Sequence, residues 1–144
     1  MAYCSQSDLE NAIEENILIE LSDDDKDGVI DSGIVERAIA DADAIVNSYL
    51  RKVFSVPLDP PIPDIVRKLS VDLSIYNLFA RRAAHFDTPE WLIKKHDDSF
   101  SMLRAINRGE IDLDVEPPPA NSAAQVASVN YPTRLFTDST LEDF

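Results

Sequence analysis

The chain has 144 residues, and 13 Lys and Arg face 27 Asp and Glu, so the formal net charge is -14 at pH 7. This length fits one domain with a core of its own, and 44% hydrophobic residues is ordinary for a soluble globular protein. No stretch approaches the roughly 20 apolar residues of a membrane span, and no secretory signal is visible. A single cysteine, Cys4, excludes an internal disulfide framework. We therefore expect an acidic, helical, cytosolic domain that does not associate with membranes.

The negative charge is concentrated near the N-terminus. Residues 1–31 contain 10 acids and 1 base, whereas residues 32–116 contain 14 acids and 11 bases. An evenly basic face that could grip phosphates is missing, so nucleic acid should be repelled rather than bound. The acidity also has a simpler interpretation, which is that it keeps the protein in solution.

The pattern of apolar residues predicts four helices in an all-α bundle. The first follows Ser7 as N-cap, and residues 17–22 then lead the chain out of it. The second has the clearest apolar stripe and runs from Gly33 to about Phe54, with Ser32 as its N-cap. These two helices are separated by an aspartate-rich turn.

The second half of the expected bundle follows a proline-rich connection at residues 56–63, which cannot continue a helix. The third helix, 64–85, is apolar around most of its circumference, as in a helix at the centre of a bundle or between subunits. The fourth has Thr88 as its cap, runs to Arg108 and stops at Gly109.

Apolar and polar residues alternate over residues 110–116, which favours a short β-strand. We expect residues 1–116 to form the helical domain and residues 117–144 to form an extended, flexible C-terminal tail. The tail has apolar anchors for interaction at Tyr131, Leu135, Phe136, Leu141 and Phe144. They favour either a segment that docks on a neighbour and orders on binding, or a tail that folds back on its own bundle.

The aspartate-rich turn resembles an EF-hand calcium loop in part. Oxygen ligands at loop positions 1, 3, 5 and 9 and glycine at position 6 are typical of such loops. Here the glycine is Gly28, but position 12 is Ile34 instead of a bidentate Glu. The candidate Ca²⁺ ligands are Asp23, Asp25, Asp27 and Asp31. The alternative is a turn whose carboxylates satisfy backbone amides without metal, and no cofactor is required.

Residues that could support catalysis do not form a recognisable pattern. His85 and His96 lie in neighbouring segments without a cysteine or acid spaced to complete a site, so we interpret them as surface or packing residues. Asp41 and Asp43 are expected on solvated helix faces. Cys4 lacks a recognisable histidine partner. The sequence therefore does not predict an enzyme.

Several segments, in this order along the chain, resemble a family of small head–tail connector proteins of Mu-like phages and prophages. They are the opening Met-Ala-Tyr-Cys, the turn DDDKDGVID (23–31), the helix VERAIADADAIVNSYL (35–50), the linker and helix 56–79, LRAINRGEIDL (103–113) and the tail RLFTDSTLEDF (134–144). The resemblance spans essentially the full chain.

The resemblance implies a non-enzymatic structural protein, a small helical bundle that forms a ring beneath the portal and joins the DNA-filled head to the tail. The implied partners are further copies of the chain, the portal protein and tail or neck proteins, with DNA passing through without specific binding. The implied location is the neck of the virion, after assembly in the bacterial cytoplasm. A calcium-binding helical protein is the main alternative function, and an acidic DNA mimic is a weaker one.

Overall fold

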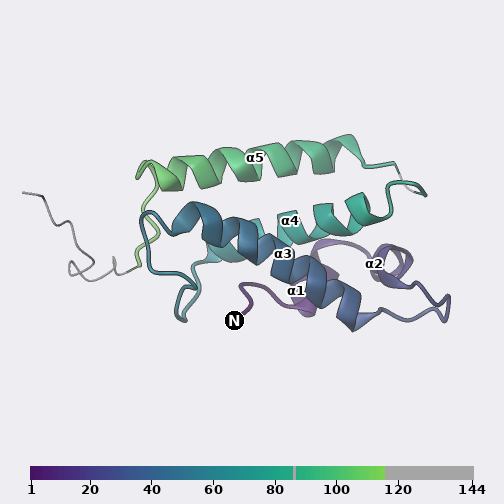
Figure 1. Cartoon of the computed structure of the whole chain (residues 1–144). Helices are drawn as coiled ribbons and strands as arrows, with labels where there is room; N and C mark the ends of the chain where they lie inside the picture. The colour runs from purple at the N-terminus through teal and green to yellow at the C-terminus, as the bar shows by residue number, and fades with distance from the viewer. Residues whose placement is uncertain (86, 116–144) are drawn as a thin grey trace, which may run out of the picture.

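The computed structural model describes residues 1–85 and 87–115, and the regular secondary structure in these residues is entirely α-helical (Figure 1). The helices are α1 Gln6–Ala12, α2 Glu15–Ser22, α3 Ser32–Leu50, α4 Asp64–Arg81 and α5 Glu90–Asn107. The predicted all-α fold class is confirmed, but the described residues form five helices instead of four.

Helix α4 lies at the centre of the bundle and packs against the other helices, α1, α2, α3 and α5. Ten of its 18 residues are buried. Figure 1 shows α5 running along one side of α3 and α4, while the short helices α1 and α2 lie near the end where α3 and α5 begin. The apolar circumference predicted for this helix is therefore explained by a central position within one chain.

Helix α1 is capped by Ser5. The sequence had suggested Ser7 instead. The Ser5 amide donates to the Asp8 carboxylate at 2.8 Å, and the Asp8 amide donates to the Ser5 hydroxyl at 3.4 Å. This reciprocal pair is a capping box, which satisfies two amides that the first turn leaves without helical partners. Both serines have an acid three residues on, Asp8 for Ser5 and Glu10 for Ser7, and the structure forms the capping box at Ser5.

Residues 17–22, which were expected to lead the chain out of the first helix, lie outside α1 but belong to a second helix, α2, that was not predicted. The chain becomes extended at Ile13 and Glu14 and then enters a helix again. Leu18 and Leu21 are fully buried against the rest of the bundle. An eight-residue helix is too short to be stable alone, so this packing stabilises it.

The long helices follow the predicted pattern, with shifts at their ends. Helix α3 ends at Leu50, and the following turn still buries Phe54. Helix α4 ends at Arg81, four residues earlier than expected. Gly109 has φ of 74° just after α5, the left-handed conformation predicted for it.

The strand expected near residues 110–116 is absent, because residues 110–115 have no regular secondary structure. Asp114 has φ of 54° and donates its amide to the Asp112 carboxylate at 3.1 Å, which turns the backbone away from an extended path. The apolar residues of this segment pack on the bundle instead, and Leu113 is only 5% exposed. The alternation of residues therefore reflects one buried face without strand pairing.

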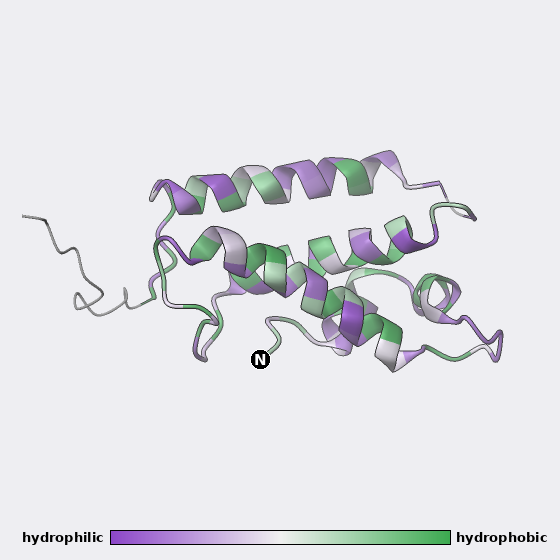
Figure 2. Cartoon of the chain, in the orientation of Figure 1, coloured by the Kyte–Doolittle hydropathy of each residue, from purple (hydrophilic) through white to green (hydrophobic). Residues whose placement is uncertain are grey.

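The apolar core has two clusters, one at each end of the bundle. The first joins α1 and α2 to the beginning of α3, the end of α4 and Leu92 of α5. The second joins the end of α3 and the beginning of α4 to the end of α5, together with Tyr3, Leu58 and Leu113. Figure 2 shows the hydrophobic residues of the long helices on the sides that face one another.

We predict that Leu113→Ala lowers the free energy of unfolding by about 2–4 kcal/mol, because it removes a buried side chain and leaves a cavity. Chemical denaturation followed by circular dichroism measures this change. The control is Asp41→Asn at an exposed position of α3, which should change stability by less than about 0.5 kcal/mol. Equal stability of Leu113→Ala and the unchanged chain would show that residues 110–115 do not belong to the core.

Candidate functional site

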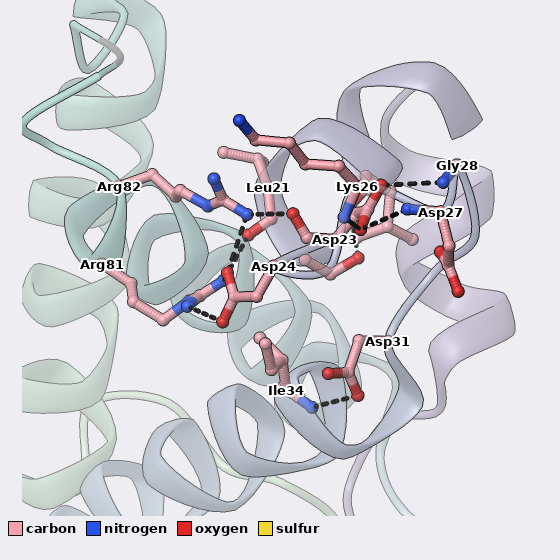
Figure 3. A network of polar contacts seen from close by, with 12 residues as sticks. Leu21, Asp23, Asp24, Lys26, Asp27, Gly28, Asp31, Ile34, Arg81 and Arg82 are labelled. Atoms are coloured by element: carbon pink, nitrogen blue, oxygen red, sulfur yellow. Dashed lines mark hydrogen bonds and ion pairs between the residues drawn. The ribbon is translucent and has the colours of Figure 1, made fainter.

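The aspartate-rich loop between α2 and α3 is organised around the carboxylate of Asp23. Its Oδ1 accepts hydrogen bonds from the amides of Lys26 at 2.6 Å and Asp27 at 3.2 Å, and its Oδ2 accepts one from Gly28 at 2.9 Å (Figure 3). These backbone hydrogen bonds, chiefly that of Gly28, lower the pKa of Asp23. Gly28 has φ of 78°, which the tight turn requires.

Asp24 connects this loop to the end of α4. Its carboxylate lies 2.9 Å from Arg81 Nη1 and 2.8 Å from Arg82 Nη2. The same two guanidinium groups donate to the backbone carbonyl groups of Leu21 and Asp23, so they also satisfy the end of α2 (Figure 3). The hydrogen bond from Arg81 is the main cause of the lowered pKa of Asp24.

Asp31 ends the loop and caps α3, in the role that the sequence analysis gave to Ser32. Its Oδ1 accepts hydrogen bonds from the amides of Gly33 at 2.9 Å and Ile34 at 3.4 Å (Figure 3). A carboxylate at this position also interacts favourably with the positive end of the helix dipole. The loop is thus fixed at both of its ends by aspartate side chains.

The four predicted calcium ligands border one hollow of about 240 Å³ on the loop surface. Within residues 1–85 and 87–115, however, no group of three or more His, Cys, Asp or Glu side chains is arranged to hold a metal ion. Backbone amides already occupy oxygens of Asp23, Asp27 and Asp31. Calcium binding by this loop stays a prediction.

Calorimetric titration with Ca²⁺ tests the calcium hypothesis. A site with these four ligands predicts saturable heat that Asp25→Asn reduces, because Asp25 is exposed at the loop surface and the substitution removes one ligand charge. Asp41→Asn is the control, because Asp41 is exposed but lies outside the loop, so this substitution should leave the heat unchanged. The absence of heat at millimolar Ca²⁺ would remove the hypothesis.

A buried polar network fixes the N-terminal segment to α3 and α4. Asp43 of α3 accepts hydrogen bonds from the amide of Tyr3 at 2.9 Å and from the hydroxyl of Ser70 at 2.6 Å. The hydroxyl of Tyr3 donates to Asn47 and accepts from the amide of Leu58 at 3.0 Å. The side chain of Tyr3 therefore connects the N-terminal segment to α3 and to the proline-rich connection.

The expected solvent exposure is wrong for Asp43, which is only 6% exposed, and correct for Asp41, which is exposed. Burial raises the pKa of Asp43 because it disfavours the charged form, although the hydrogen bonds from Ser70 and Tyr3 oppose this effect. The pattern of the helix contained a signal, because Asp43 lies four residues after Ile39 and three before Val46, on the same face as these apolar residues. Charge alone suggested a surface position.

We predict that Asp43→Ala lowers the free energy of unfolding by about 1–3 kcal/mol, since it leaves the Tyr3 amide and Ser70 hydroxyl without their acceptor. Asp43→Asn keeps one acceptor and should cost less. A carboxyl group whose pKa is raised in the folded state binds a proton more readily there, so its protonation favours folding. The stability of the unchanged chain relative to Asp43→Asn should therefore increase as pH falls towards the usual carboxyl pKa.

Denaturation curves for both variants at several pH values measure these effects, with Asp41→Asn as the exposed control. A stability difference between the unchanged chain and Asp43→Asn that does not vary with pH would contradict the assigned burial.

The remaining reactive side chains are in packing or surface positions. His96 stacks on Tyr76 with ring centroids 3.9 Å apart, whereas His85 is exposed. Cys4 is buried with its Sγ 3.1 Å from the Ser70 hydroxyl, and burial raises the pKa of its thiol. His85 and His96 are thus a surface and a packing residue, as interpreted from the sequence, and the structure does not bring them together with Cys4.

Several grooves are open on the described surface of the bundle, and two of them bear on binding. One of about 600 Å³ lies between the N-terminal segment and α3, and the buried network forms part of its wall. The other, of about 500 Å³, we call the tryptophan groove, and it is formed by residues 10–14, Ile17 and Trp91. Trp91 is 48% exposed, which is unusual for the largest apolar side chain.

A sequence model of the bacteriophage Mu Gp36 family matches residues 3–130. The chain belongs to this family. This member of the Mu Gp36 family is therefore a Mu-like phage protein, as its resemblance to phage proteins predicted. No curated protein matches the chain.

The match covers the whole described helical bundle of this Mu Gp36 family member, together with the first part of the segment that follows it. In the described part of the bundle, no helix is long and apolar enough to cross a membrane. The predicted interaction residues lie outside the described residues, and they are Tyr131, Leu135, Phe136, Leu141 and Phe144.

Proposed function

We propose that this protein is a non-enzymatic head–tail connector, or head-completion protein, that forms a ring between the portal and the tail of a Mu-like phage or prophage. Its partners are further copies of itself, the portal protein and tail or neck proteins. It assembles in the bacterial cytoplasm and remains in the neck of the virion. The observation that carries the proposal is the family match over residues 3–130.

The shape of the chain suits this role. A ring protein needs a rigid body and separate surfaces for its neighbours. Three long helices with a shared core supply the body, and the exposed Trp91 lies on a groove at one end of it. At the other end, α5 is followed by a segment that packs on the core up to Val115 and leads into the tail.

The distribution of charge suits a protein through which DNA passes. The aspartate-rich loop exposes Asp25 and Asp27, whereas Asp24 is neutralised by two arginines. Residues 1–31 hold most of the net negative charge, and their acids begin at Asp8, in the part of the segment that contains α1, α2 and the aspartate-rich loop. Repeated around a channel, these acids would repel phosphates, so DNA would slide without being retained.

Deletion of the gene from the phage or prophage tests the proposal. The expected result is DNA-filled heads and separate tails that do not join, as seen by electron microscopy, with recovery when the full chain is supplied in trans. Mass spectrometry of purified, intact virions should detect the protein. Normal infectious particles from the deletion strain, or absence of the protein from those virions, would contradict the proposed function.

A further inference from the structure

The tryptophan groove has an apolar floor and an acidic rim. Ile13, Ile17 and Trp91 supply the apolar surface, and Glu10 and Glu14 are the charged residues that line it. Both glutamates are exposed and form no ion pair with the described residues. A partially exposed tryptophan beside aliphatic side chains is typical of surfaces that bind another protein segment. The groove therefore suits a segment with apolar anchors and a positive charge.

The lysine beside Trp91 is already paired with a carboxylate in the core. Lys95 Nζ lies 5.5 Å from the centroid of the Trp91 ring, but the same group is 3.3 Å from Asp72. Asp72 is nearly buried and also pairs with Lys68 at 2.6 Å. Lys95 is thus held by the core carboxylate, and the negative charges of Glu10 and Glu14 remain available to a partner.

The tail of this chain contains one segment of matching chemistry. Residues 131–136 read Tyr-Pro-Thr-Arg-Leu-Phe, which places Arg134 directly before the anchors Leu135 and Phe136. Arg134 is the single base among residues 117–144. The later anchors, Leu141 and Phe144, are interleaved with acids and would be repelled by the glutamates of the groove. Charge complementarity therefore favours Leu135 and Phe136 over the later anchors as the residues that dock in the tryptophan groove.

The positions of the groove and of Val115, the last described residue before the tail, indicate whether the tail docks on its own copy or on another copy of the chain. Trp91 lies in the first turn of α5, and that helix ends at Asn107, about 24 Å further along its axis. Val115, the last described residue before the tail, packs on the core cluster at this end of α5. A return to its own groove would require a reversal just after the triplet Pro117–Pro119, and consecutive prolines favour extended backbone. A neighbour arranged head to tail offers its groove without a reversal.

We propose that residues 131–136 of one copy dock in the tryptophan groove of the next copy. Residues 116–130 can span at most about 50 Å, which is enough to reach a neighbouring bundle. The contact joins two different surfaces, so it is heterologous, and repetition by rotation closes a ring. This inference rests on the ring assembly proposed above and gives it a specific interface.

Fluorescence of Trp91 tests this docking, because Trp91 is the only tryptophan of the chain. A synthetic peptide of residues 127–140 is titrated into the full-length protein. We expect a saturable shift of the emission to shorter wavelength as the groove is covered. The Phe136→Ala peptide should bind about tenfold more weakly or worse, and a peptide of residues 137–144 should cause no shift. Absence of a shift at millimolar peptide 127–140 would overturn the proposal.

A charge exchange tests the register of the contact. The Arg134→Glu peptide should bind about fivefold more weakly than the natural peptide, and its affinity should recover when the protein carries Glu14→Arg. Glu20→Arg, an exposed acid of α2 outside the groove, is the matched control and should not restore binding. Equal loss of affinity with both protein variants would contradict the assigned site.

The fluorescence spectrum of the protein at low concentration distinguishes docking of the tail in a second copy from docking in the groove of its own copy. Docking in a neighbour predicts the same exposed Trp91 emission for the dilute unchanged chain and its Phe136→Ala variant. A blue-shifted spectrum in the dilute unchanged chain that Phe136→Ala reverses would overturn the assignment to a second copy.

Particle assembly separates this inference from the proposed function. The docking proposal predicts that Phe136→Ala impairs assembly of neck rings in the complemented deletion strain. Normal rings with this variant, while the protein is still present in the neck, would overturn the docking and leave the connector function intact. Absence of the protein from virions, together with binding of the peptide, would contradict the function alone.

Discussion

Burial of helix α4 among the other helices is the constraint on which the structure depends. A helix that is buried on most sides must find partners for its polar side chains inside the protein, since unpaired polar groups are costly there. Ser70 donates to Asp43, and Asp72 pairs with Lys68 and Lys95. These contacts connect α4 to α3 and α5, and Asp43 in turn holds the N-terminal segment. The hydrogen bonds and ion pairs that satisfy the buried polar side chains of α4 thus fix the positions of the surrounding elements.

Features governed by local sequence could be predicted. The apolar stripe of α3, the proline-rich connection and the left-handed Gly109 depend on residues that are close in the chain, and the structure has each of them. The all-α class followed from the same periodicity. Helix ends were less predictable, because Ser5 and Ser7 are both suitable caps and Asp31 competes with Ser32.

Features that depend on distant residues could not be predicted. The sequence indicated an unusual aspartate-rich turn, but the pairing of Asp24 with Arg81 and Arg82 joins residues almost 60 positions apart. The hydrogen bonds that satisfy the buried carboxylate of Asp43 come from Tyr3 and Ser70, which are 40 and 27 positions away. Helix α2 forms because its leucines pack on the bundle. Its short sequence alone did not predict a separate helix. The tryptophan groove likewise combines residues from α1, α2 and α5.

A reconstruction of the virion neck by electron cryomicroscopy tests the central claim most directly. The account predicts a closed ring built from this helical bundle between portal and tail. The aspartate-rich loop, residues 23–31, should face the DNA channel, and density for residues 131–136 should lie against Trp91 of the adjacent copy. A neck without this bundle would contradict the account. A ring whose loop faces outward would contradict the role assigned to the acidic charge.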